Sequence, residues 1–443
     1  MMRTALLVLA LLSSSAFAAE APDPFEQALA QARARRAPVL VDFTAPWCYS
    51  CYYMAKNVLT GPEWDKARRD TVAIELDADS PEGTRWMKAW SVKAMPTYLV
   101  FNADGEELGR ILGEQTRTDF YRWLNTATSR SNPLDTLKAS VTDGSKPSVA
   151  AAREVLRAYH ARYDATGGLA WHGALAAPVQ TALAADAPAA AWVARLRLQQ
   201  AAAAKDAAAC LESGEAVLAA DLGCERPYEL DKVLGCSADR PELAPVREEL
   251  LRAQVKPMQS LLDTRVFARP RCADERSVVL ATADLYGTLG EDGPERVTLD
   301  RAIAEVKKRI GGNVKKDRSL SDNLRVYLDR AGRTGELDAL LLKLIAAYPN
   351  DYVYAYRYAR SLAAQGQHGP ALPYYEKAAA KAYGVNKLRN AELRARSLQA
   401  VGRNAEARQV LAEALQANGP WFPEDAAKLK ALMDQLPPLK SAS

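Results

Sequence analysis

The sequence predicts an α/β domain followed by a longer all-helical region. Apolar runs typical of buried strands alternate with helical patterns over residues 23–128. After Val149 the strand patterns nearly vanish, and Ala, Leu, Arg and Glu recur with apolar residues at helical spacing. Two cysteines, Cys48 and Cys51, stand where the first strand gives way to a helix.

Residues 1–18 have the pattern of a cleavable export signal. Arg3 precedes an apolar segment over 5–12, and small residues then end at Ala18. The apolar segment is too short to span a bilayer comfortably. A retained N-terminal anchor is the alternative. We expect a periplasmic or secreted protein, cut near Ala18 and without a membrane span thereafter.

Length and charge restrict the partners. The chain has 443 residues and a formal net charge of +4, which becomes +3 when Arg3 leaves with the signal. This is nearly neutral, and no polybasic tract is present, so nucleic-acid binding has no electrostatic support. The length predicts two or three domains.

The elements of the α/β domain follow in order from the apolar patterns. We expect a helix over 24–36, a buried strand over 38–44, a helix over 48–65 interrupted near Gly61-Pro62, a strand over 71–76, a helix over 83–90, a strand over 97–101, a turn over 103–105, a strand over 106–112 and a helix over 116–127.

The spacing of Cys48 and Cys51 predicts a redox site. Two cysteines with two residues between them can open and close a disulfide with little backbone movement. The first thiol lies where unpaired helix amides favour its thiolate, so it attacks. The second lies one turn further on and resolves the mixed disulfide. Structural zinc is the rival interpretation, but it needs four ligands, usually from a second close pair, which is missing.

Residues 23–128 resemble a thioredoxin-fold domain. The resemblance rests on Trp47-Cys48-x-x-Cys51, on Asp42 before it, on Met95-Pro96 before an apolar strand, and on Gly113 after the last strand. The stretch over 42–48 is more similar to the C-terminal domain of membrane thiol:disulfide interchange proteins than to cytosolic thioredoxin. The fold class we expect is therefore an α/β thioredoxin fold followed by an all-α helical-repeat region.

Asp42 stands six residues before Cys48, where the family has a buried acid. Next to such a cysteine pair, a buried carboxylate can accept the proton from Cys51 when that thiol must attack. The alternative is a strand-end acid satisfied by water. We expect Asp42 to be catalytic together with Cys48 and Cys51.

Four residues are expected to bind substrate. A cis bond before Pro96 would offer the backbone of Met95 to an extended substrate strand, whereas an ordinary edge-strand proline would not. The resemblance implies that Gly113 lets another backbone approach. Trp47 either packs under the site or forms part of the docking surface.

The residues around the cysteines depart from the family pattern. Tyr49-Ser50 between them carries no charge and lacks the proline or histidine of well-known oxidants and reductants. Tyr52 stands where many relatives have a lysine. The direction of electron flow therefore stays open, and our hypothesis is a reductase or isomerase.

Four further cysteines are expected to form structural disulfides in an oxidising compartment. They are Cys210, Cys224, Cys236 and Cys272. Three connectivities are possible, and sequence alone does not choose among them. Our preference is Cys224 with Cys236 and Cys210 with Cys272.

The remainder divides into a linker over 129–148, a helical region with degenerate repeats over 149–320, and clearer repeats over 321–443. Gly332, Gly366 and Gly402 are 34 and then 36 residues apart, and each precedes a small or apolar residue by five positions. This resembles the tetratricopeptide repeat, a helix pair with a turn glycine. Stacked pairs leave a concave face that usually binds a peptide or protein, although it can also be a plain scaffold.

The leading hypothesis is an exported thiol-disulfide oxidoreductase that reduces or isomerises protein disulfides. The dithiol itself carries two electrons, so we expect no cofactor and no metal. The expected partners are proteins with disulfides, a membrane thiol donor, and a peptide or protein on the repeat region. The alternative is a non-catalytic interaction scaffold whose cysteine pair is a static disulfide.

Overall fold

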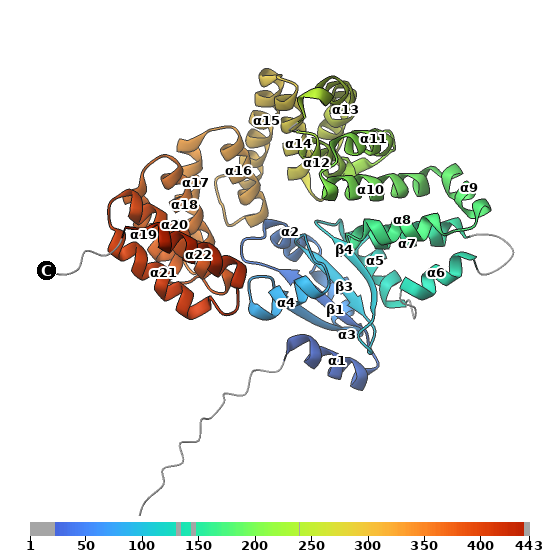
Figure 1. Cartoon of the computed structure of the whole chain (residues 1–443), viewed down its shortest axis with the longest axis horizontal. Helices are drawn as coiled ribbons and strands as arrows, with labels where there is room; N and C mark the ends of the chain where they lie inside the picture. The colour runs from blue at the N-terminus through green and yellow to red at the C-terminus, as the bar shows by residue number, and fades with distance from the viewer. Residues whose placement is uncertain (1–22, 130–133, 143–147, 239, 438–443) are drawn as a thin grey trace, which may run out of the picture.

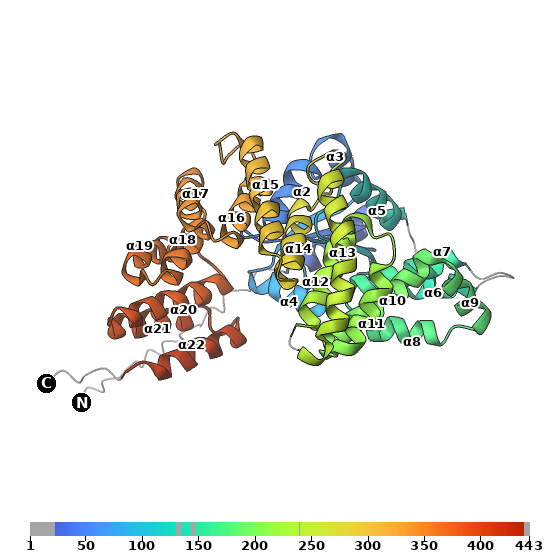
Figure 2. The ribbon, with the colours of Figure 1, turned by 90° about the horizontal axis from the view of Figure 1, so that it is seen from above.

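The computed structural model describes residues 23–129, 134–142, 148–238 and 240–437. The expected signal over 1–18 lies outside these ranges. In Figure 1 the α/β domain lies on the inner side of an arc formed by the helices that follow it in sequence. Figure 2 shows the arc from above, with α6–α9 at one end and α20–α22 at the other.

The α/β domain contains the predicted elements with small shifts of their ends. Its elements are α1 Pro24–Arg35, β1 Val39–Thr44, α2 Tyr49–Asn57, α3 Gly61–Asp70, β2 Val72–Asp77, α4 Pro81–Ala89, β3 Thr97–Phe101, β4 Glu107–Leu112 and α5 Arg117–Ser129. The break expected near Gly61-Pro62 separates α2 from α3, and Gly61 has a φ of +77°, which suits glycine.

The sheet has the order β2-β1-β3-β4. β1 pairs parallel with β2 and antiparallel with β3, and β3 pairs antiparallel with β4. Apolar side chains of α1 and α4 pack on one face of the sheet, and those of α2, α3 and α5 pack on the other. Two covered faces explain why β1 and β3 are nearly continuous apolar runs.

The rest of the described chain is helical. Its helices are α6 Leu134–Thr142, α7 Val149–Ala161, α8 Ala165–Gly173, α9 Ala177–Ala185, α10 Ala187–Ala204, α11 Ala207–Leu218, α12 Arg226–Cys236, α13 Ala244–Arg265, α14 Glu275–Thr288, α15 Asp292–Ile310, α16 Arg318–Arg330, α17 Thr334–Ala347, α18 Tyr352–Ala364, α19 His368–Ala379, α20 Val385–Ala400, α21 Asn404–Asn418 and α22 Pro423–Gln435, with 3-10 turns at Gly223–Glu225 and Pro241–Leu243. We call α7–α22 the array. Helix α6 lies within the stretch expected as a linker.

The predicted helix pairs are present in the last third of the chain. The turns of α16–α17, α18–α19 and α20–α21 contain Gly332, Gly366 and Gly402, all at positive φ. The small residues Ala371 and Ala407, five positions after a glycine, are fully buried where the helices pack. This confirms the tetratricopeptide-like architecture.

The preferred pairing of the four array cysteines is wrong. The structure joins Cys210 to Cys236 and Cys224 to Cys272. Helix α12 separates Cys224 from Cys236, and twelve residues of mostly helical chain span roughly 15–18 Å. Cα atoms joined by a disulfide lie within about 7 Å of each other. A rigid helix between the two cysteines therefore excludes their pairing.

None of the helices within the described ranges combines the length and the apolar character that a membrane crossing requires.

Candidate dithiol site

The Cys48–Cys51 pair lies at the start of α2 and is oxidised in the structure. β1 ends at Thr44, and a turn closed by the hydrogen bond from the Cys48 amide to the Ala45 carbonyl, 3.0 Å, leads into the helix. Cys48 is the N-cap, and its sulfur accepts a hydrogen bond from the Cys51 amide at 3.0 Å. This amide hydrogen bond and the positive end of the helix dipole both favour a thiolate, so Cys48 is placed to attack.

Asp42 lies on β1, opposite Glu75 and Tyr98 on the neighbouring strands. Its Oδ1 atom is buried and has no hydrogen-bond partner among the described residues. Burial, and then the charge of Glu75, raise the pKa of Asp42 to about 8. A carboxyl with such a pKa exchanges its proton near neutral pH, as the expected proton acceptor must.

The Met95-Pro96 loop lies beside the cysteines. The peptide bond between these residues is cis, as the resemblance implied. The Met95 side chain packs against the small apolar cluster that contains both cysteines. The Pro96 carbonyl accepts a hydrogen bond from the Gly113 amide at 2.8 Å, and Gly113 has a φ of +74° with open space where a Cβ would be. The structure therefore brings the expected substrate-binding residues to one place.

Trp47 is anchored by an acid that the sequence did not reveal. Its indole Nε1 donates to Asp79 Oδ2 at 2.8 Å, and the ring packs against the cysteine cluster. Asp79 follows β2, where only the fold brings it next to Trp47. Burial is the main cause of the raised pKa of Asp79. Trp47 is partly buried, so it both packs under the site and contributes to its surface.

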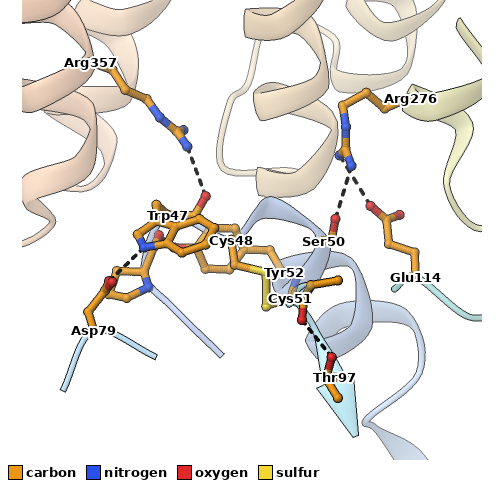
Figure 3. Close-up of a disulfide and its surroundings, with 12 residues drawn as sticks. Trp47, Cys48, Ser50, Cys51, Tyr52, Asp79, Thr97, Glu114, Arg276 and Arg357 are labelled. Carbon is orange, nitrogen blue, oxygen red and sulfur yellow. Dashed lines mark hydrogen bonds and ion pairs between the residues drawn. A yellow bond between two sulfur atoms is a disulfide. The ribbon is translucent and has the colours of Figure 1, made fainter. Parts of the chain in front are cut away.

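Three array arginines contact the cysteine motif, two of them in Figure 3. Arg276 on α14 lies over the Tyr49 ring, 3.8 Å from its centroid, and donates to Ser50 Oγ at 3.2 Å. Arg357 on α18 donates to the Trp47 carbonyl at 3.0 Å.

The third arginine, Arg318 on α16, lies 3.8 Å from the Tyr52 ring centroid. A guanidinium over an aromatic ring is attracted by the electrons of the ring face, and an aliphatic side chain offers no such attraction. The two tyrosines that depart from the family pattern, Tyr49 and Tyr52, are thus both contacts for array arginines. The two unusual tyrosines were visible in the sequence. The sequence could not show their partners, because the arginines lie more than 200 residues away along the chain.

The pair itself is nearly buried. Only 3% of Cys48 and 7% of Cys51 is exposed to solvent, and the apolar neighbours of the two cysteines belong to the α/β domain. The array contacts beside the pair are polar, since guanidinium groups meet tyrosines, a hydroxyl and a backbone carbonyl, and polar interfaces between domains resemble transient protein–protein interfaces. Among the residues that the structure describes, no three His, Cys, Asp or Glu side chains gather as a metal site would require.

A dithiol at a helix N-terminus, a buried acid on the central strand before it and a cis-proline loop beside it define a thioredoxin-like redox site. The comparisons with known proteins agree for this part of the chain. Residues 25–128 match the family model described as "Thioredoxin-like domain".

Two similar curated proteins are thiol:disulfide interchange proteins. The chain is 37% identical over 84 residues to the thiol:disulfide interchange protein DsbD of Klebsiella pneumoniae subsp. pneumoniae, covering 18% of this chain and 14% of that protein. It is 34% identical over 116 residues to DsbD of Pseudomonas fluorescens, covering 25% and 20%. The chain thus spans at most a fifth of the length of these two relatives.

Among solved structures, the chain is similar to the solution structure of a thioredoxin from Thermus thermophilus. It is 28% identical, with a TM-score of 0.23, and the match covers 24% of this chain and 85% of the thioredoxin.

Proposed function

We propose that the protein is an exported thiol-disulfide oxidoreductase that reduces or isomerises protein disulfides. The Cys48 thiolate attacks one sulfur of a substrate disulfide, so that a mixed disulfide forms and the other substrate sulfur leaves as a thiolate. Cys51 loses its proton to Asp42 and attacks the Cys48 sulfur. The second substrate thiol leaves, the Cys48–Cys51 disulfide closes, and two electrons have passed to the substrate.

The observation that carries this proposal is the position of Cys48 at the N-cap of α2. Its sulfur already accepts the Cys51 amide hydrogen bond, and Met95 packs against the pair from the loop that would hold an extended substrate. The matched thioredoxin-like domain and the similarity to DsbD support the same chemistry. Neither supports one direction of electron flow over the other.

The cellular setting is part of the proposal. The signal-like residues 1–18 and the two array disulfides suit an oxidising compartment such as the periplasm. A reductase there must be recharged, and we propose a dithiol protein at the membrane as the electron donor.

The array is proposed to take part in binding the substrate protein. It curves around the α/β domain and contacts the cysteine motif, so a protein that approaches the pair meets array side chains as well (Figure 1). An extended peptide or a flexible loop suits this approach better than a rigid globular surface, since the pair is nearly buried.

The experiment that tests the function uses the two cysteines in the full chain. Cys48→Ser should abolish reduction of insulin, because the attacking thiolate is lost. Cys51→Ser should retain attack but accumulate mixed disulfides, which can be identified by mass spectrometry. Full insulin reduction by Cys48→Ser rules out this mechanism.

A second candidate function is a scaffold with a static disulfide. The low exposure of Cys48 and Cys51 and the array contacts on Trp47 and Ser50 favour it. Glutathione exchange separates the two functions. A static disulfide shows no exchange near neutral pH, whereas a redox pair equilibrates with the glutathione buffer.

A further inference from the structure

Arg276 of the array reaches the two residues that separate Cys48 from Cys51. Its guanidinium stacks on Tyr49 and donates to the Ser50 hydroxyl, although 226 residues of sequence separate Arg276 from Ser50. Its side chain is only 8% exposed. Burying a cation is costly, so a guanidinium held against the dipeptide between the two cysteines calls for an explanation.

The α/β domain supplies one of the two carboxyl groups beside Arg276. Glu114, just after β4, accepts from Arg276 at 3.4 Å (Figure 3). Glu114 also hydrogen-bonds the Ser50 hydroxyl. Asp274, 3.6 Å from the guanidinium, is the second carboxylate, and Asn323 Oδ1 accepts from Arg276 at 3.2 Å. Arg276 of the array and Glu114 of the α/β domain therefore both contact the Ser50 hydroxyl.

The two charges respond differently to burial. Burial lowers the pKa of the Arg276 guanidinium, but the carboxylates of Asp274 and Glu114 outweigh this effect and hold its pKa above the ordinary value. Burial, and then Asp274, raise the pKa of Glu114 to about 8. Arg276 is therefore permanently charged, whereas Glu114 is only partly ionised near neutral pH.

A charge next to the motif acts on the reduced pair. The attacking form of Cys48 is an anion at the start of α2, and buried charges interact more strongly than charges in water. Loss of the Arg276 cation makes the local potential more negative whatever the ionisation of Glu114, and so disfavours the thiolate. Loss of the Glu114 carboxylate has the opposite effect, but only where this group is ionised, at about pH 8 and above.

We propose that Arg276 and Glu114 form a charge pair that sets the reactivity of Cys48, so that the array completes the redox site. Both are positioning residues: they act through the Tyr49-Ser50 dipeptide and the local potential. This proposal rests on the proposed function and names the part of the chain that tunes it. The alternative is a purely structural ion pair that holds the two domains together.

The two explanations predict different signs. If the ion pair is only structural, removal of either residue weakens the same contact between the domains. The reactivity of Cys48 then changes in the same direction in both variants. If the charges act on the thiolate, Arg276→Gln slows Cys48, and Glu114→Gln accelerates it at a pH at which Glu114 is ionised.

The experiment measures the alkylation of Cys48 in the full chain. The Cys48–Cys51 pair is first reduced in a glutathione buffer that leaves the array disulfides closed. Iodoacetamide is then added at pH 6 and, in a second series, at pH 8.5, and the peptide with Cys48 is followed by mass spectrometry. At pH 6 we expect Arg276→Gln to react about three- to tenfold more slowly than the wild type. Glu114→Gln should stay within about twofold of the wild type at pH 6, because a carboxyl with a pKa of about 8 is almost entirely protonated there, and should react faster than the wild type at pH 8.5, where it is ionised.

Two controls test charge against contact. Arg276→Lys keeps the charge and should stay within about twofold of the wild-type rate. Lys56→Met removes another ion pair across the same interface, Lys56 with Asp317 at 2.7 Å, without touching the dipeptide, and should leave the rate unchanged.

Equal rates in Arg276→Gln, Glu114→Gln and the wild type at both pH values overturn the proposal, and so do shifts of both variants in one direction. If Arg276→Gln does not fold, Glu114→Gln decides alone: acceleration at pH 8.5 supports the charge pair, and an unchanged or slower rate at that pH overturns it. If the wild-type pair does not exchange with glutathione, the proposed function itself fails. If it exchanges and the variants do not diverge, only the charge pair fails.

Discussion

Two carboxyl groups of the α/β domain have pKa values raised to about 8 by burial, and they differ in their hydrogen-bond partners. Glu114 faces a guanidinium and a hydroxyl group, whereas Asp42 Oδ1 has no partner in the part of the chain described by the structure. The sequence indicated Asp42 because a fixed spacing links it to Cys48 within one strand and one turn. It could not indicate Glu114, since a carboxyl after the last strand acquires its role only from an arginine in another domain.

The burial of Asp42 predicts a stability that falls as pH rises. Its folded pKa of about 8 lies above the ordinary value of 3.8, so folding favours the protonated form. The stabilisation is present below about pH 4 and is lost as pH rises toward 8. Asp42→Asn should remove this dependence and gain on the order of 3 kcal/mol relative to the wild type between pH 5 and 8. Urea unfolding at both pH values measures it.

The control for this prediction is Asp104→Asn, in an exposed turn. It should follow the wild-type pH dependence. An Asp42→Asn variant with the wild-type pH dependence would show that this carboxyl is not held in its protonated form by the fold.

At the scale of single elements, prediction from sequence succeeded where the pattern is local. β1 and β3 are apolar on both faces, and the break at Gly61 follows from a glycine and a proline together. The cysteine pairing failed because it depends on which helices pack, and no local pattern encodes that. Helix α6 was missed because its short sequence lies between turn-like residues.

The start of α20 is an element-scale contact with a clear test. Gly384 has a φ of +53°, and a Cβ there would lie 1.8 Å from the Asp79 carbonyl oxygen, which also accepts from the Val385 amide at 3.3 Å. Gly384→Ala should therefore push α20 away from the loop after β2. We expect a loss of roughly 2–4 kcal/mol of unfolding free energy, together with faster amide exchange in that loop.

Gly402→Ala is the matched control for the start of α20. Gly402 has a φ of +80°, and the space where a Cβ would lie is open. Gly402→Ala therefore strains the backbone but, unlike Gly384→Ala, creates no steric clash. A Gly384→Ala variant no less stable than Gly402→Ala would contradict the close contact with Asp79.

At the scale of the whole molecule, the sequence predicted two kinds of domain but not their arrangement. Tyr49 and Tyr52 were visible as departures from the family pattern, yet nothing near them in sequence indicates Arg276 or Arg318. Single charged residues such as these have no periodicity that would reveal a partner in another domain. The arc around the α/β domain is therefore a property that only the folded chain shows (Figure 1).

The array disulfides should stabilise the whole molecule to different extents. Cys224 and Cys272 close a loop with a sequence separation of 48, and Cys210 and Cys236 close one of 26. A longer loop restrains the unfolded chain more, so replacing the first pair by alanines should cost about 4 kcal/mol and replacing the second somewhat less. Urea unfolding of the two double variants gives the comparison, and a larger loss for the shorter loop contradicts this account.

Each array disulfide is sheltered on one side only. Cys210 and Cys272 belong to the apolar core of the array, whereas their partners Cys236 and Cys224 are partly buried at its edge. A reduced Cys48 of another copy can therefore attack only the outer sulfur of each bridge, and the sulfur that must leave as a thiolate then lies in an apolar core. Because an apolar surrounding disfavours that charge, the bridges resist the copies that share their compartment.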